Sequence, residues 1–208
     1  MSQNKTNFAV PLAFVGMMFF AIGFALGINS FLIPVLKGAL SLPSGVAYLL
    51  LAATFVPFLI FGYPASATIA KIGYKRTMAL SFLIFAVAFI LFVLSAKLEN
   101  FILFLIASFV SGAANAYLQA SVNPYITILG PIESAAKRMS IMGICNKLAW
   151  PVAPLFFALV VADQTNVQTS DLYLPFYIII GVFLLLGIIS LMAPLPEVKA
   201  AGEDESDT

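Results

Sequence analysis

The chain has 208 residues, of which 62% are hydrophobic and 9% are charged, and its formal net charge is +1. Soluble domains usually carry about a quarter charged residues, so this composition predicts an integral membrane protein. The sequence contains no histidine, which removes the commonest metal ligand, and no basic patch that could bind nucleic acid. The single cysteine, Cys145, excludes an intrachain disulfide.

Long charge-free runs predict an all-α membrane protein with six transmembrane helices, because about 20 apolar residues cross a bilayer. A polar N-terminal segment, residues 1–7, precedes them. The predicted helices lie at about 8–35, 45–70, 77–96, 101–129, 139–162 and 172–193, within a transmembrane domain at 8–195. The first run is longer than the core of a signal peptide, so we expect it to be retained.

Residues 196–208 form an acidic tail without apolar periodicity. This composition predicts disorder, or the start of a loop that leads to further chain.

Basic residues are distributed unequally between the two sides that six spans would define. One side holds Lys5, Lys71, Lys75, Arg76, Lys137, Arg138 and Lys199, whereas the other holds Lys37 and Lys97. Cytoplasmic loops carry the excess of lysine and arginine, so both termini are predicted to be cytoplasmic.

The fourth predicted helix carries Asn115, Gln119 and Asn123 at four-residue steps, followed at once by Pro124. Such steps place side chains on nearly one face of a helix. Amide groups inside a bilayer need polar partners that lipid cannot supply. The stripe therefore predicts a wall of a polar pathway, and hydrogen bonding between helices alone is the alternative. Carboxamides donate and accept together, which suits the hydroxyl groups of a sugar.

Polar residues also interrupt the first and fifth helices. Asn29 and Ser30 are adjacent in the first, where Gly23 and Gly27 form a GxxxG pair that favours close helix packing. In the fifth, Trp150 stands four residues after Asn146, so the two share a face. We expect the tryptophan ring to offer a surface for the apolar side of a sugar.

Lys147 is the sharpest single feature of the sequence. It lies nine residues after Arg138, which places it about 13 Å into a hydrocarbon core about 30 Å thick. Its ammonium group could snorkel to the interface, or it could face a cavity and bind substrate. The six predicted spans contain no Asp or Glu that could pair with it. We therefore hypothesise a substrate with a negative or strongly polar group.

No nucleophile–base pair, metal-ligand cluster or phosphate-binding loop stands out in the sequence. The chain is therefore predicted not to be an enzyme, and no cofactor is expected.

Several short motifs resemble the fucose–proton symporter family of the major facilitator superfamily, which includes bacterial glucose/galactose transporters. The resemblance extends from about residue 12 to residue 196. Its motifs are Leu32-Ile33-Pro34, Gly73-Tyr74-Lys75-Arg76, Asn123-Pro124-Tyr125, Ile128-Leu129-Gly130-Pro131, Arg138, Asn146 and Pro154.

The resemblance implies the N-terminal six-helix half of a sugar transporter, built from two inverted three-helix repeats and working by alternating access. It implies a bacterial inner-membrane location and a partner, either a C-terminal half or a second copy. Proton-coupled members carry acids where this chain has Ser30 and Gln119, and the superfamily's loop aspartate is replaced near Ala70. These departures put proton coupling by that route in doubt.

The combined prediction is a wall of a hexose-sized pathway. The predicted substrate contacts are Asn29, Gln119, Asn123, Asn146, Lys147 and Trp150, while Pro124 and Pro154 shape the helices. A six-span sensor, an assembly subunit or a truncated remnant that does not transport is the alternative. A small channel would require polar stripes on more helices than show them.

Overall fold

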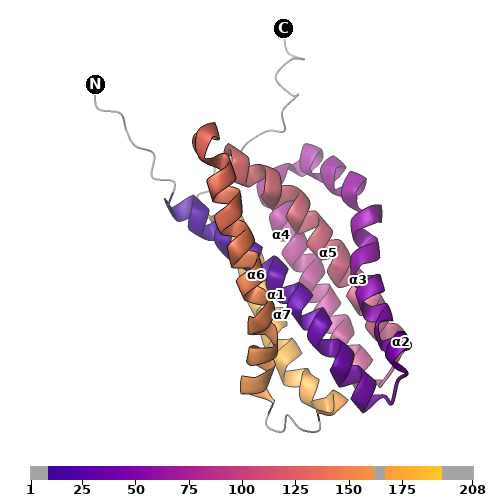
Figure 1. Cartoon of the computed structure of the whole chain (residues 1–208). Coiled ribbons are helices and arrows are strands. Elements are labelled where there is room, and N and C mark those ends of the chain that lie inside the picture. Colours follow the sequence, from indigo (N-terminus) through magenta and orange to yellow (C-terminus); the bar gives the residue numbers. More distant parts are fainter. Residues whose placement is uncertain (1–8, 162–166, 194–208) are drawn as a thin grey trace, which may run out of the picture.

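The computed structural model describes residues 9–161 and 167–193 (Figure 1). Its regular structure within these residues is entirely helical, which confirms the all-α fold class. The helices are α1 Ala9–Ala39, α2 Ser44–Ala47, α3 Leu49–Ile60, α4 Gly62–Lys97, α5 Phe101–Ile128, α6 Ala135–Val160 and α7 Tyr173–Met192, with 3-10 turns η1 Ile132–Ser134 and η2 Thr169–Leu172. Both the predicted N-terminal segment 1–7 and the tail 196–208 lie outside the described residues.

The predicted helix over 45–70 is divided in the structure. It consists of α2, α3 and the beginning of α4, with breaks at Tyr48 and Phe61. Pro64 explains the second break, because it lacks the N–H group that would bond to the carbonyl of Ile60. Helix α4 then runs through Gly73, whose φ of 81° is open to glycine and strained for other residues. Gly73 is thus the joint between the second and third predicted spans.

Within the described residues, five helices are long and apolar enough to cross a membrane, and the shorter apolar segment Ser44–Ile60 accompanies them. In Figure 1 the chain runs down α1, returns along α3, turns at the joint in α4, and continues through α5, α6 and α7. The helix ends differ from the predicted ones by a few residues. Lys37, for example, was expected to begin a loop but lies in the last turn of α1.

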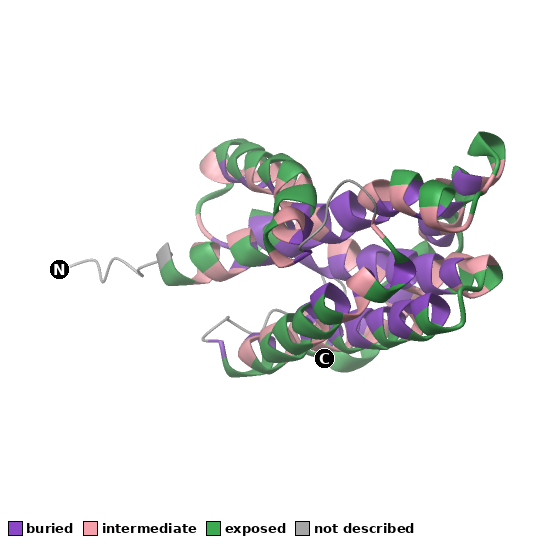
Figure 2. Ribbon diagram, turned by 90° about the horizontal axis from the view of Figure 1, so that it is seen from below, coloured by how far each residue is buried: buried purple, intermediate pink, exposed green. Residues whose placement is uncertain are grey.

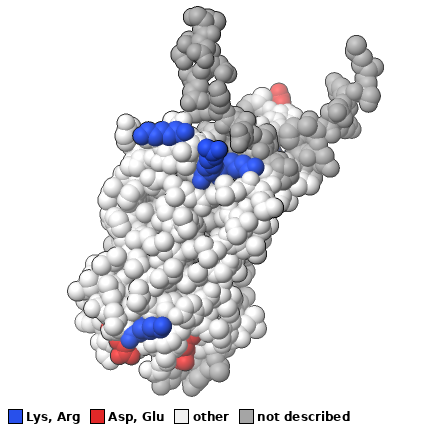
Figure 3. All heavy atoms as spheres, turned by 180° about the vertical axis from the view of Figure 1, so that it is seen from behind, with Lys and Arg blue, Asp and Glu red and all other residues white. Residues whose placement is uncertain are grey.

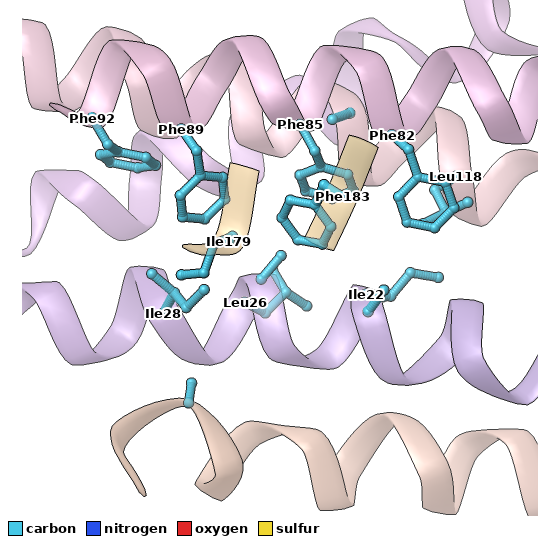
Figure 4. Close-up of a cluster of buried hydrophobic side chains, with 14 of the residues drawn as sticks. Ile22, Leu26, Ile28, Phe82, Phe85, Phe89, Phe92, Leu118, Ile179 and Phe183 are labelled. Atoms are coloured by element: carbon cyan, nitrogen blue, oxygen red, sulfur yellow. The ribbon is translucent and has the colours of Figure 1, made fainter. Parts of the chain in front are cut away.

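A stripe of phenylalanines forms the centre of the core (Figure 4). Phe82, Phe85, Phe89 and Phe92 recur every three or four residues of α4 and meet rings from α7. The Phe85 and Phe183 centroids, for instance, are 4.7 Å apart. Lipid tails are as apolar as these rings, so burying the rings gains little from the hydrophobic effect. The stripe stabilises the bundle mainly through van der Waals packing.

The opposite face of this part of α4 is exposed, at Leu83, Val87, Ile90 and Leu94. This face is apolar and exposed, but the helix also packs against α5 and α7, and 56% of its apolar window is buried, as in α1 and α5. Figure 2 shows the same division throughout the bundle, with buried residues on inward faces and exposed residues on outward faces.

Helix α6 is the least buried of the long helices. Only 17% of its apolar window is buried, compared with 56% in α1 and α5. It packs mainly on α1, so most of its surface has no neighbour within the described chain.

Apart from Lys147, near the middle of α6, the charged side chains of the described residues lie at the two ends of the bundle. On the face drawn in Figure 3 the middle carries none. At the end opposite the α4 joint, Lys97 Nζ donates to the hydroxyl oxygen of Tyr177 at 3.2 Å, and Thr169 Oγ1 donates to Glu99 Oε1 at 2.9 Å. These two bonds connect the end of α4 to α7 and its preceding turn.

Candidate functional site

Amide side chains from two helices converge on one turn of α1. From α6, Asn146 Nδ2 donates to the carbonyl oxygen of Phe19 at 3.1 Å. From α5, Asn115 Nδ2 donates to the carbonyl oxygen of Ile22 at 3.4 Å. Phe19 and Ile22 are three residues apart, so the amides of α5 and α6 lie at the same depth in the bundle.

The amide stripe of α5 divides between packing and exposure. Asn115 is only 1% exposed and forms part of the α1–α5 contact. Gln119 Nε2 donates to Asn115 Oδ1 at 3.2 Å, while Gln119 itself is half-buried, as is Asn123 one turn further. Asn115 therefore fits the alternative of hydrogen bonding between helices. The side chains of Gln119 and Asn123 remain partly exposed.

Asn29 lies within the contact between α1 and α5. Its Nδ2 donates to the carbonyl oxygen of Ala25 at 3.1 Å and to Ser111 Oγ at 3.4 Å. The side chain is 1% exposed, and its Oδ1 has no partner among the described residues. Asn29 was predicted to line the pathway, but in this structure its side chain is enclosed between the two helices.

Glycines bring α6 against α1. A β-carbon on Gly23 would overlap the carbonyl oxygen of Asn146, and one on Gly27 would lie 2.7 Å from the carbonyl oxygen of Trp150. Close approach of backbones at small residues is the usual contact between membrane helices. The GxxxG pair thus fixes where Asn146 and Trp150 sit.

Lys147 and Trp150 form a cation–π pair on α6. The Lys147 Nζ atom lies 4.9 Å from the centroid of the Trp150 ring. Lys147 is exposed and Trp150 is half-buried, and the buried Trp150 Nε1 has no hydrogen-bond partner among the described residues. The quadrupole of an indole ring attracts an ammonium group that lies over its face. The Trp150 ring therefore stabilises the positive charge of Lys147 without a carboxylate partner.

These residues form an open wall in this chain. A groove of about 580 Å³ lies near Pro34 of α1 and Pro154 of α6, and the amides do not line it. In the described part, no group of His, Cys, Asp and Glu residues could hold a metal ion. The arrangement offers neutral donors and acceptors, one aromatic face and one cation.

Arg138 has a structural role that the sequence prediction missed. Helix α5 ends at Ile128, so its last carbonyl groups lack helical partners. Arg138 Nε donates to the carbonyl of Ile126 at 3.1 Å, and Nη2 donates to that of Thr127 at 3.1 Å. Nη1 donates to the carbonyl of Pro131 at 2.9 Å and to the Ser134 hydroxyl. The available signal was an arginine a few residues after the Gly-Pro pair that ends α5.

Taken together, these features define a polytopic helical membrane protein with a polar wall. The Major Facilitator Superfamily model matches residues 14–207, and the chain belongs to this family. The resemblance found in the sequence is thereby confirmed.

Named relatives are sugar transporters. A glucose/galactose transporter of Brucella abortus (strain 9-941) is 31% identical over 98% of this chain and 50% of its own length. The L-fucose-proton symporter of Escherichia coli is 22% identical over 98% of this chain and 51% of its own length. The chain thus spans about half the length of the curated relatives it matches.

The fold has a counterpart among solved structures. A Major Facilitator Superfamily transporter, FucP, in the outward conformation superimposes with a TM-score of 0.78 at 23% identity. The match covers 97% of this chain and 53% of that one. Membership of the Major Facilitator Superfamily and the apolar helices together establish an integral membrane protein.

Proposed function

We propose that this chain forms the N-terminal half of a transporter for hexose-like sugars that works by alternating access. The observation that carries the proposal is the convergence of amides from α5 and α6 on one turn of α1 inside an apolar bundle. Polar side chains at that depth are costly unless they serve a polar pathway. The named functions of the relatives support sugar as the solute.

Each residue of the wall receives a role under this proposal. Gln119, Asn123 and Asn146 hydrogen-bond sugar hydroxyls, because an amide donates and accepts at once. Trp150 stacks against the apolar face of the sugar ring. Asn29 orients α1 against α5 and acts as a positioning residue, since it is enclosed there.

The exposed face of α6 supports a partner for this chain. Its apolar residues Ile144, Leu148 and Leu155 are each more than half exposed. A C-terminal half or a second copy packed beside this face would close the open wall into a pathway. We place the protein in a bacterial inner membrane with both termini cytoplasmic, because Lys71, Arg76 and their basic neighbours lie at the end where α1 begins.

Trp150 is the only tryptophan in the chain, so its fluorescence reports on the site directly. In lipid nanodiscs, titration with glucose, galactose or fucose should change its emission in a saturable way for at least one sugar. Gln119→Ala should weaken that binding about fivefold, the equivalent of one neutral hydrogen bond of about 1 kcal/mol.

The matched control is Ser66→Ala, which removes an exposed hydroxyl of α4 that bonds only within its own helix. This variant should bind as the wild type does. An emission that no sugar changes, either for the chain alone or for the chain with a C-terminal half, would count against the proposal.

Lys147 tests whether the substrate carries negative charge. Lys147→Met should lower affinity for hexuronates by about tenfold or more, because a charged hydrogen bond contributes roughly 1.5–3 kcal/mol. Binding of neutral hexoses should change much less. The control Lys137→Met removes an exposed lysine of the same helix near its N-terminal end. Equal losses for acidic and neutral sugars would reject a charge-specific role.

A second candidate function does not involve transport. A six-span sensor, assembly subunit or remnant would show the same helical fold without transport. Uptake into vesicles, measured for the chain with and without a C-terminal half, separates the two functions. Sugar binding without uptake under both conditions favours the sensor.

A further inference from the structure

An apolar groove runs along the outer face of the bundle, between α4 and α7. Its volume is about 340 Å³. The lining residues are Ala79, Leu80 and Leu83 of α4, Leu184, Gly187, Ile188 and Leu191 of α7, and Arg76. None of the amides of the candidate site belongs to this set, so the groove is a separate feature.

Arg76 gives the groove one charged end. It is exposed, and it lies three residues after the joint at Gly73, in the first turn of a new helical segment. The start of a helical segment carries the positive end of its dipole, which adds to the charge of the guanidinium. The described acids are Glu99, Glu133 and Asp171, and none of them lines the groove.

The rest of the groove matches a hydrocarbon chain. Leu83, Leu184, Ile188 and Leu191 are each between 43% and 56% exposed, so their side chains would face acyl chains in a bilayer. Gly187 keeps the two helices close, since a β-carbon there would lie 3.4 Å from the Phe82 Cβ. The result is a channel for an acyl chain that ends at a cation near the membrane surface.

We propose that this groove binds an anionic phospholipid, with one acyl chain between α4 and α7 and the headgroup phosphate at Arg76. Arginine binds phosphate through two parallel N–H donors, which makes it the better choice than lysine for such a headgroup. Lys71 and Lys75 add positive charge at the same end and favour a headgroup with a net negative charge over a zwitterionic one. The bound lipid would bridge the third predicted span and α7 beside the joint at Gly73.

Native mass spectrometry of the full chain tests this site with phosphatidylglycerol and phosphatidylcholine of identical acyl chains. The wild type should retain phosphatidylglycerol about fivefold more than phosphatidylcholine, as expected for one basic residue at a membrane surface. Arg76→Gln should remove this preference. Lys71→Gln, which changes an exposed cation of the same end outside the groove, should keep most of it.

A second pair of variants tests the acyl-chain part. Ile188→Trp fills the groove and should lower retention of both lipids, whereas Leu94→Trp, at another exposed apolar position of α4 outside the groove, should not. The proposal is overturned if the wild type retains both lipids equally, if Lys71→Gln abolishes the preference as fully as Arg76→Gln does, or if Ile188→Trp leaves retention unchanged.

Discussion

Replacing Gly23 by valine is expected to destabilise the protein by about 3 kcal/mol, at the upper end of the usual cost of overpacking. The reason is steric, because a β-carbon at this position overlaps the carbonyl oxygen of Asn146 on α6. The backbone of α6 cannot avoid the new side chain by rotating, as a long side chain could. Helix α6 must therefore move away from α1. We expect a lower midpoint of thermal unfolding in detergent, measured by far-UV circular dichroism.

The same displacement should affect the candidate site. Asn146 holds the Phe19 carbonyl at 3.1 Å only while α1 and α6 are in contact. The Trp150 emission spectrum should therefore shift in Gly23→Val, because Trp150 lies on the part of α6 that moves.

Gly16 provides the matched control in the same helix. A β-carbon there would lie 3.6 Å from Met142 Sδ, which is ordinary contact with a flexible side chain. Gly16→Ala should be neutral or should stabilise the protein by about 0.5 kcal/mol, since alanine favours the helix. If Gly23→Val unfolds at the same temperature as Gly16→Ala, the close packing of α1 on α6 is not what positions the site.

Replacing Arg138 by methionine is expected to cost roughly 3 kcal/mol of stability, because hydrogen bonds to charged groups contribute more than neutral ones and the carbonyl of the buried Ile126 loses its partner. Arg138 is 7% exposed, and methionine keeps much of its length without its donors. The carbonyls of Ile126, Thr127 and Pro131 lose their partner together. Thermal unfolding gives the loss in stability.

Amide hydrogen exchange locates the effect of Arg138→Met. Faster exchange should be confined at first to the end of α5 and the loop 129–134, where the guanidinium binds. Lys137→Met is the control, since Lys137 is the exposed neighbour of Arg138. Arg138→Lys should recover only part of the loss, because one ammonium group cannot reproduce the planar set of donors. An Arg138→Met variant as stable as Lys137→Met would contradict the structural role.

Apolar content and the placement of charge were sufficient to predict the class of the protein. A run without charge such as residues 6–36 can be stable only as a span, whatever its neighbours do. The helix bounds follow to within a few residues for the same reason. The breaks at Tyr48 and Phe61 were not predicted, because prolines are tolerated in membrane helices and whether a helix ends at one depends on its neighbours.

Part of the candidate site was equally visible in the sequence. The four-residue steps place Gln119 and Asn123 on one face, and the spacing of Lys147 and Trp150 brings their side chains within reach of each other. Arg138 appeared in the sequence as a charge that orients the chain and as one residue of the family resemblance, without a structural role. Its hydrogen bonds join residues up to 12 positions apart across a turn. Helical spacing in the sequence does not predict contacts across a turn.

The sequence alone therefore determined a charge-poor bundle of spans with amides and one lysine at bilayer depth, because each of those properties depends on local composition and helical spacing. Only the tertiary structure decided which amides are enclosed and which stay open. Asn29 and Asn115 are shut into the α1–α5 contact while Gln119 stays partly exposed. That division depends on how closely α1 approaches α5, and the distance between two helices depends on the side chains that both of them present.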